Sequence, residues 1–337
     1  MHDRTRAITT GVLLAAALAL AWVLTGSLLT IFAGILVASL LDAIVRQLAR
    51  VLPLPHAALV ILVTLAVFGT VIAGLSLGGM QLWQSVDDLV SMLIEQARQI
   101  YLELRRMIIS IGMVDNDQSL LADAMPDPAG LLAGMQTVFG SAVGAIANVV
   151  VIVFLGIFFA LNPAGYRDGM LDLAPRHLQP RLRTALDAVG HTLRGWIVTQ
   201  VIMMGVIGTL VGTLLWALGT PNALTLGVLA GALNFIPFLG PIISAVPVLL
   251  TLASQDMTTF LLGALGMLLI QNLEGYVLTP LMQQRVIHLP PAWSLCTMLI
   301  MGSLFGFFGV ALATPAYAVI RTLTLRLYIE PRMGLED

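Results

Sequence analysis

The stretch LNFIPFLGPIISAVP, residues 233–247, decides the fold because it is apolar enough for a bilayer yet carries three prolines. It lies inside a run without charged residues, 222–254, and its 33 residues fit neither one membrane crossing of about 20 residues nor two of about 40. A proline inside a helix removes a hydrogen bond, and the freed backbone groups cannot face lipid. The pattern predicts a helical hairpin that enters the membrane, turns at Pro237, Gly240 and Pro241, and leaves on the same side.

A second run without Asp, Glu or Arg covers residues 286–320 and has GSLFGFFG, 302–309, at its centre. It predicts a second re-entrant hairpin, with Gly306 and Gly309 at its tip. Each run follows an apolar segment, turns at aromatic and glycine residues, and reaches a proline soon afterwards. Two such units that enter from opposite faces are typical of inverted repeats in secondary transporters. The alternative is two ordinary kinked helices, each of which crosses the membrane once.

The composition indicates an integral membrane protein. Hydrophobic residues make up 58% of the 337 and charged residues 10%, whereas soluble domains carry roughly 25% charged residues. The net charge of -2 shows no bias towards nucleic acid, and the single cysteine excludes an intrachain disulfide. We therefore predict an all-α polytopic membrane protein with about six spanning helices, two re-entrant hairpins and an approximate inverted repeat.

Apolar segments and their breaks place the six spans. Residues 7–41 fit two short antiparallel helices joined by TGS at 25–27. The other spans are expected at about 57–80, 138–161, 196–218 and 258–282. The corresponding domains are a membrane scaffold at 1–80, an extracytoplasmic segment at 81–137, the fourth span with a cytoplasmic linker at 138–195, a transport unit at 196–325 and a cytoplasmic tail at 326–337.

The segment 81–137 predicts an amphipathic helix, because apolar residues recur at spacings of three and four from Leu82 to Ile111. That helix could pack on the protein, lie on the membrane surface or pair with a sister subunit. The same segment holds three arginines against eight acidic residues, while arginines gather in the segments on the opposite side. The positive-inside rule therefore places both termini in the cytoplasm. Arg285 distinguishes the two topologies, since hairpins place it inside and single crossings place it outside.

Glu274 is the strongest candidate for a binding residue, because a carboxylate at membrane depth is costly unless it is paired or hydrated. Gln271 and Asn272 lie beside it in the sequence, and Asn234 and Gln200 offer further amides in other apolar segments. Glu274 could bind a proton, a cation or a polar solute; the alternative is a buried structural carboxylate. Neither catalytic motifs nor metal-ligand spacings occur, so we predict no enzyme activity, catalytic residue, cofactor or metal.

Four ordered motifs resemble the autoinducer-2 exporter family of bacterial permeases. They are LRGWIVTQ (193–200), LNFIPFLGPIISAVP (233–247), NLEGYVLTPLMQQRVIHLPP (272–291) and GSLFGFFGVALATPAYAVIRTL (302–323). The resemblance is strong over about 190–325 and covers only the layout of the first half. PPAWSLC after His288 and Thr314 before Pro315 depart mildly from the family pattern, which puts substrate identity in doubt and leaves the fold intact.

The resemblance implies an inner-membrane secondary transporter with two re-entrant hairpins, an elevator mechanism and an oligomeric state that is pentameric in some members. Family motifs would put Asn234, Pro237, Gly240 and Pro241 at the first tip, with Asn272, Glu274, Gly306 and Gly309 near the same site. Export of a small polar metabolite such as the quorum-sensing signal autoinducer-2 is the first expectation. Sodium or lithium exchange for protons is the alternative, and a non-transporting membrane scaffold is the second. The expected partners are the solute or ion, membrane lipid and further copies of the chain.

Overall fold

The computed structural model describes residues 24–69, 142–283 and 290–330, together with four helical residues at 95, 99, 102 and 106. Every regular element in this part of the chain is a helix. Among these described residues, four helices are long and apolar enough to cross a membrane, or five if one bent pair counts as a span. The all-α prediction is confirmed, whereas the count of six spans stays a prediction. The predicted first helix, most of segment 81–137 and Arg285 lie outside the described residues.

The chain divides into two compact units, each built from separate stretches of sequence. The first combines Met1–Ala66, Asn148–Val198 and Gln284–Asp337, and the second combines Val67–Ala147 and Thr199–Gln283. The predicted division into scaffold and transport unit concerns movement, so it stays a prediction.

The first unit contains α2 (Thr25–Leu48), a helix at His56–Gly69, α6 (Ala142–Leu161), α7 (Pro163–Asp172), the start of α8 (Gln179–Ala217), α13 (Pro291–Thr324) and the π-helix η2 (Leu325–Ile329). α2 and α6 approach closely at Gly34, where an added Cβ would lie 2.8 Å from the Cβ of Leu155. Small residues allow such contacts between apolar helices. The buried carboxylate of Asp42 accepts from Arg46 on the same helix, at 2.9 Å, and from Arg194 of α8, at 3.1 Å. This ion-pair cluster holds α2 against α8.

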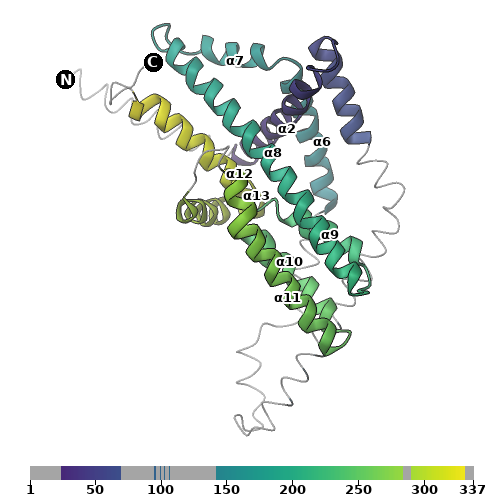
Figure 1. Ribbon diagram of the computed structural model, residues 1–337. Helices are drawn as coiled ribbons and strands as arrows, with labels where there is room; N and C mark the ends of the chain where they lie inside the picture. The colour runs from purple at the N-terminus through teal and green to yellow at the C-terminus, as the bar shows by residue number, and fades with distance from the viewer. Residues whose placement is uncertain are drawn as a thin grey trace, which may run out of the picture. The chain divides into compact units, whose positions relative to one another are not determined.

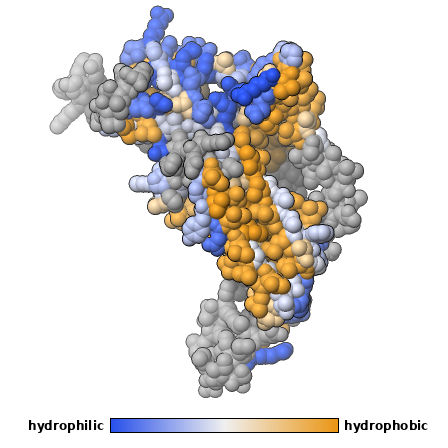
Figure 2. Space-filling model, in the orientation of Figure 1, coloured by the Kyte–Doolittle hydropathy of each residue, from blue (hydrophilic) through white to orange (hydrophobic). Residues whose placement is uncertain are grey.

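The second unit contains the end of α8, α9 (Ala223–Leu233), α10 (Leu239–Ala253), α11 (Met257–Leu273), the π-helix η1 (Glu274–Leu278) and α12 (Thr279–Gln283). Figure 1 shows α9, α10 and α11 beside the C-terminal half of α8. One apolar core joins these four helices, and its buried members are Ile207, Val211, Leu215, Ala223, Leu226, Ala230, Val248, Leu252, Met267 and Ile270. Figure 2 shows a hydrophobic surface along α11, where Leu261, Leu265 and Leu268 are exposed. A chain with so much outward-facing leucine is suited to lipid rather than to water.

Two predicted boundaries are corrected by the structure. α2 begins at Thr25, so TGS at 25–27 forms the first turn of a helix instead of a loop. The fifth span, predicted at about 196–218, falls within α8, which begins earlier than the predicted span, at Gln179; ion pairs with α7 stabilise the polar first half of α8. Other boundaries agree closely: α6 ends at Leu161, and α11 with its continuation covers 257–283.

Both predicted tips contain a break in the helix. α9 ends at Leu233 and α10 begins at Leu239, and an added Cβ at Gly240 would overlap the carbonyl oxygen of Leu233. In α13 the backbone is non-helical at Gly306, and an added Cβ at Gly309 would overlap the carbonyl oxygen of Met301. How either pair of helical segments lies relative to a membrane stays a prediction.

Candidate functional site

Three of the predicted polar residues come together in the second unit. Gln200 lies on α8, Asn234 is the C-terminal capping residue of α9, and Glu274 is the first residue of η1. They are separated in sequence by 34 and 40 positions. The cluster therefore exists only because α8, α9 and α11 pack around one core.

Gln200 fixes the end of α9. Its Nε2 donates to the backbone oxygen of Asn234 at 2.6 Å, and both residues are buried, at 8% and 2% exposed. The last carbonyl groups of a helix have no partner within the helix. A buried amide from another helix satisfies one of them, so Gln200 holds the first tip at a defined position against α8.

Within the described part of the chain, Asn234 and Glu274 are the residues of the cluster whose side chains carry unpaired buried oxygens. The side chain of Asn234 lies within hydrogen-bonding reach of the Glu274 carboxylate. Asn234 Oδ1 and Glu274 Oε2 are both buried and have no hydrogen-bond partner among the residues that the structure describes. A buried acceptor without a partner costs about 1–3 kcal/mol. Two such oxygens, on side chains that lie near each other, are suited to bind a donor group of a solute, a proton or a cation.

The backbone at Glu274 departs from regular α-helix. Residues 274–278 form a π-helix, and the N–H of Thr279 donates to the Glu274 carbonyl, five residues earlier. Pro280 follows at once, and a proline in a regular helix would clash with the carbonyl four residues before it. Single π turns of this kind occur frequently at functional sites. The Glu274 carboxylate therefore belongs to the first residue of a π turn, where the helix is wider than a regular α-helix.

The remaining candidates lie elsewhere. Asn272 is exposed and donates to the Leu268 carbonyl of its own helix at 2.7 Å, while Gln271 is half-buried. Pro237 lies in the turn between α9 and α10, and Pro241 lies in the first turn of α10. Gly306 and Gly309 belong to the first unit, and the Asn234 and Glu274 cluster belongs to the second. Their predicted roles in binding stay predictions.

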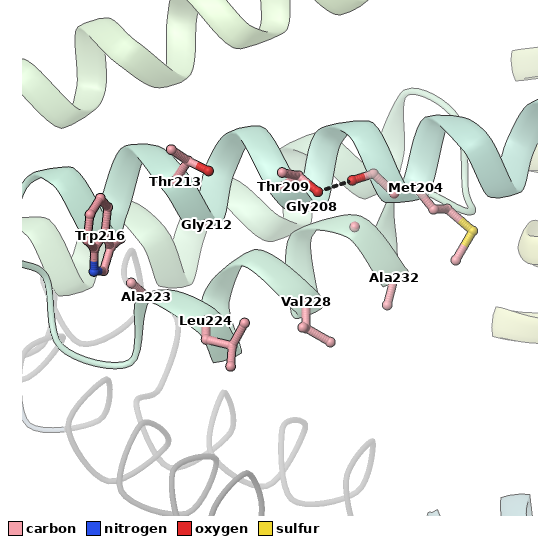
Figure 3. A pocket seen from close by; sticks show the side chains of 12 residues that line it. Met204, Gly208, Thr209, Gly212, Thr213, Trp216, Ala223, Leu224, Val228 and Ala232 are labelled. Atoms are coloured by element: carbon pink, nitrogen blue, oxygen red, sulfur yellow. Dashed lines mark hydrogen bonds between the residues drawn. The ribbon is translucent and has the colours of Figure 1, made fainter. Parts of the chain in front are cut away.

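A groove of about 650 Å³ lies in the second unit, but none of the three clustered residues lines it. Its walls come from α8 and α9, as Figure 3 shows, and include Met204, Gly205, Gly208, Thr209, Gly212, Thr213, Trp216, Ala223, Leu224, Val228, Gly231 and Ala232. The Thr209 hydroxyl donates to the Gly205 carbonyl within α8, at 2.7 Å. This leaves the groove mostly apolar, so we assign the polar chemistry to the Gln200, Asn234 and Glu274 cluster.

The sequence analysis did not single out the glycines beside that groove. Gly208 and Gly212 on α8 face Gly227 and Gly231 on α9, and an added Cβ at Gly227 would lie 2.7 Å from the Cα of Gly212. Each pair is a GxxxG motif, the signal that could have revealed this contact. The close backbone contact brings α9 onto α8 and thereby sets the distance between Asn234 and Gln200.

Comparison with known proteins gives the family. The profile of the AI-2E family transporter matches residues 12–328. The chain is 32% identical over 144 residues to "Putative transport protein YrrI" of Bacillus subtilis, over 43% of this chain and 40% of that protein. It is 26% identical over 320 residues to "Putative transport protein MT0215" of Mycobacterium tuberculosis, over 91% and 85%.

A third relative carries a more specific name. "AI-2 transport protein TqsA" of Escherichia coli is 28% identical over 141 residues, which are 42% of this chain and 40% of TqsA. The chain thus spans about two fifths of the length of YrrI and of TqsA. The profile match extends over nearly the whole chain and confirms the resemblance carried by the four motifs, so this protein belongs to the AI-2E transporter family.

Proposed function

We propose that the protein is an inner-membrane secondary transporter that exports a small polar metabolite such as autoinducer-2, with Glu274, Asn234 and Gln200 at its solute site. The observation that carries this proposal is the pair of buried acceptors without partners, Asn234 Oδ1 and Glu274 Oε2. A hydroxyl-bearing solute would donate to both oxygens. The family membership and the name of TqsA support transport of such a solute.

The proposed movement is an elevator-type displacement of the hairpin unit within a homo-oligomer. The helix breaks at 234–238 and at Gly306 support it, because irregular backbone inside a membrane occurs where it lines a cavity or is buried in protein. In this proposal both termini are cytoplasmic, and the two helix pairs enter the membrane from opposite faces.

Exchange of sodium or lithium for protons is the second candidate function. Carboxylate and amide oxygens are the ligands that hard cations prefer, and the Asn234 and Glu274 oxygens provide both types. A carboxylate that releases its cation can then take up a proton, so one residue would carry both ions in turn. In the third candidate, a membrane scaffold without transport activity, the same oxygens would have a structural role only.

The decisive variant is Glu274→Gln, studied by flux into proteoliposomes against autoinducer-2, sodium and lithium. Glutamine keeps the size of the side chain and removes its charge. We expect flux to fall by at least about 100-fold, because the loss of one charge-assisted contact corresponds to about 3 kcal/mol. Assembly of the protein should be unchanged. Glu330→Gln is the matched control, because that carboxylate is bound to Arg326 at 3.1 Å outside the cluster.

The solute panel separates the three candidates. Flux of autoinducer-2 alone supports export, and sodium or lithium flux that acidifies or alkalinises the vesicle lumen supports exchange. Normal flux in Glu274→Gln would overturn the site. The absence of flux for every solute in the unaltered protein would favour the scaffold.

A further inference from the structure

α7 leaves α6 at nearly a right angle. The two helices are bent by 86° at Asn162, whose side chain accepts from the Gly165 N–H at 3.0 Å, and Pro163 occupies the first helical position. Asparagine as a capping residue followed by proline is a strong signal for a helix start. The bend is therefore specified locally by the sequence.

The surface of α6 indicates how this helix is oriented in the membrane. It contains no charged residue, and its exposed side chains include Val149, Val151, Phe154 and Phe158. A helix with this outer surface is expected to run along the membrane normal. Because α7 leaves the C-terminal end of α6 at 86°, α7 then lies along the membrane surface.

α7 itself has two different faces. Tyr166, Met170 and Leu173, spaced by four and three, are 46%, 56% and 89% exposed. Leu171, on the opposite side, is buried against the protein. Tyr166 also packs edge-on against Phe159 of α6, with ring centroids 5.0 Å apart. Tyrosine is enriched at the level of lipid headgroups, where an apolar ring with a polar tip is favoured.

Ion pairs hold α7 in this orientation. Arg167 donates to Asp187 of α8 at 2.7 Å, and Arg183 of α8 donates to Asp168 at 3.1 Å. In the first pair the arginine belongs to α7, and in the second it belongs to α8. A rotation of α7 about its axis would break both pairs. The exposed apolar face is thereby held away from α8.

We propose that α7 is an interfacial helix whose Tyr166, Met170 and Leu173 insert into the boundary between headgroups and acyl chains. The leaflet is the one at the C-terminal end of α6, which the arginine distribution predicts to be cytoplasmic. Helices with one apolar and one polar face bind membranes in this way. Exposed Arg176, shortly after α7, adds attraction to anionic headgroups. This proposal concerns the lipid surface and does not depend on the solute site.

The test uses single cysteines in the full chain with Cys296→Ser, carrying an environment-sensitive fluorophore. Positions 170 and 173 probe the apolar face, and Asp172→Cys probes the exposed polar side of the same helix. The protein is reconstituted in vesicles of phosphatidylethanolamine and phosphatidylglycerol, with or without bromine near the top of the acyl chains. We expect brominated lipid to reduce fluorescence at 170 and 173 by about half and at 172 by far less, since interfacial faces lie only about 5–10 Å deep.

Two other results would overturn the proposal. Equal, weak quenching at all three positions together with access to an aqueous quencher would show that the face meets water. Weak quenching together with disulfide cross-linking between the 170 positions of two chains would show that a second copy covers it. Because the substituted side chains are exposed, neither result can be attributed to a disturbed core.

Discussion

The two helix tips share one construction and differ in the residue that turns the chain. At each tip a residue with positive φ precedes a glycine that packs against a backbone carbonyl seven or eight positions earlier: Gly240 on Leu233 and Gly309 on Met301. The turning residue is Phe238 at the first tip, with φ 66° and ψ -48°, and Gly306 at the second, with φ 62° and ψ -148°. Both tips thus bring two helical segments close together. The first tip does so with a strained residue, Phe238, and the second with a glycine, which adopts positive φ without strain.

The strain at Phe238 has a specific form. The Leu239 N–H donates to the Pro237 carbonyl at 2.8 Å across Phe238, which makes a γ-turn of the rare positive-φ type. A residue other than glycine in such a conformation costs about 1–3 kcal/mol and persists only where the surroundings hold it. Gln200 and Asn234 supply that support through a buried hydrogen bond of 2.6 Å. The strained tip is the one that belongs to the polar cluster.

The largest effect is expected where the two tips agree. In Gly240→Ala and in Gly309→Ala, the new Cβ would overlap a backbone carbonyl oxygen that cannot move independently of its helix. We expect each variant to lose at least about 3 kcal/mol of folding free energy and most of its folded yield. Thermal melting in detergent, followed by circular dichroism, measures the loss.

Gly275→Ala is the matched control, because an added Cβ there would have nothing within 4 Å. Its melting temperature should equal or slightly exceed that of the unaltered protein. A Gly240→Ala protein that melts normally would contradict the close packing of the first tip.

An intermediate effect is expected from Gly306→Ala. No atom lies within 4 Å of the added Cβ, so the cost comes only from a backbone conformation that is accessible essentially to glycine. We expect a loss of about 1–3 kcal/mol, seen as a lower melting temperature. Gly169→Ala, at an open helical position in the same unit, should keep or slightly raise stability, because alanine is the better helix former. Equal melting of both variants would argue against the positive φ at Gly306.

The smallest effect, and one of opposite sign, is expected from Phe238→Gly. Glycine relieves the positive φ, while the greater freedom of the unfolded chain opposes the gain by about 0.5–1 kcal/mol. The net change should be a stabilisation of up to about 1 kcal/mol. In Phe307→Gly, at an exposed helical position beside the second tip, glycine should destabilise by about 1 kcal/mol. If both variants shift the melting temperature downwards equally, the strain at Phe238 is absent.

Local features of the fold followed from the sequence wherever a break had a chemical cause. Uncharged runs located α6 and α11, and prolines and glycines located both interruptions. The polar start of α8 was missed as helix, because its support comes from Asp168 and Arg167 on another helix. The α8 and α9 glycine contact was also missed, although its GxxxG spacing was visible.

The candidate site was predictable as residue types and not as an arrangement. Glu274, Asn234 and Gln200 were selected because polar groups in apolar segments are costly. Nothing in the sequence distinguishes the amides of Asn234 and Gln200 from that of Asn272, which donates to its own helix at 2.7 Å. The distinction depends on which face of α11 turns towards α9, and packing of the common core sets that face.

The membrane class, the family, the breaks at both tips and the polar residues available for binding can all be read from the sequence, because each depends on local composition or on a short motif. Three features depend on the packing of the helices: Gln200 caps α9, the buried oxygens Asn234 Oδ1 and Glu274 Oε2 belong to one cluster, and α7 turns its apolar face outwards. These features arise from contacts between residues distant in the chain. Such contacts form only when the helices are fixed against one another, either by a shared apolar core or by ion pairs between two helices.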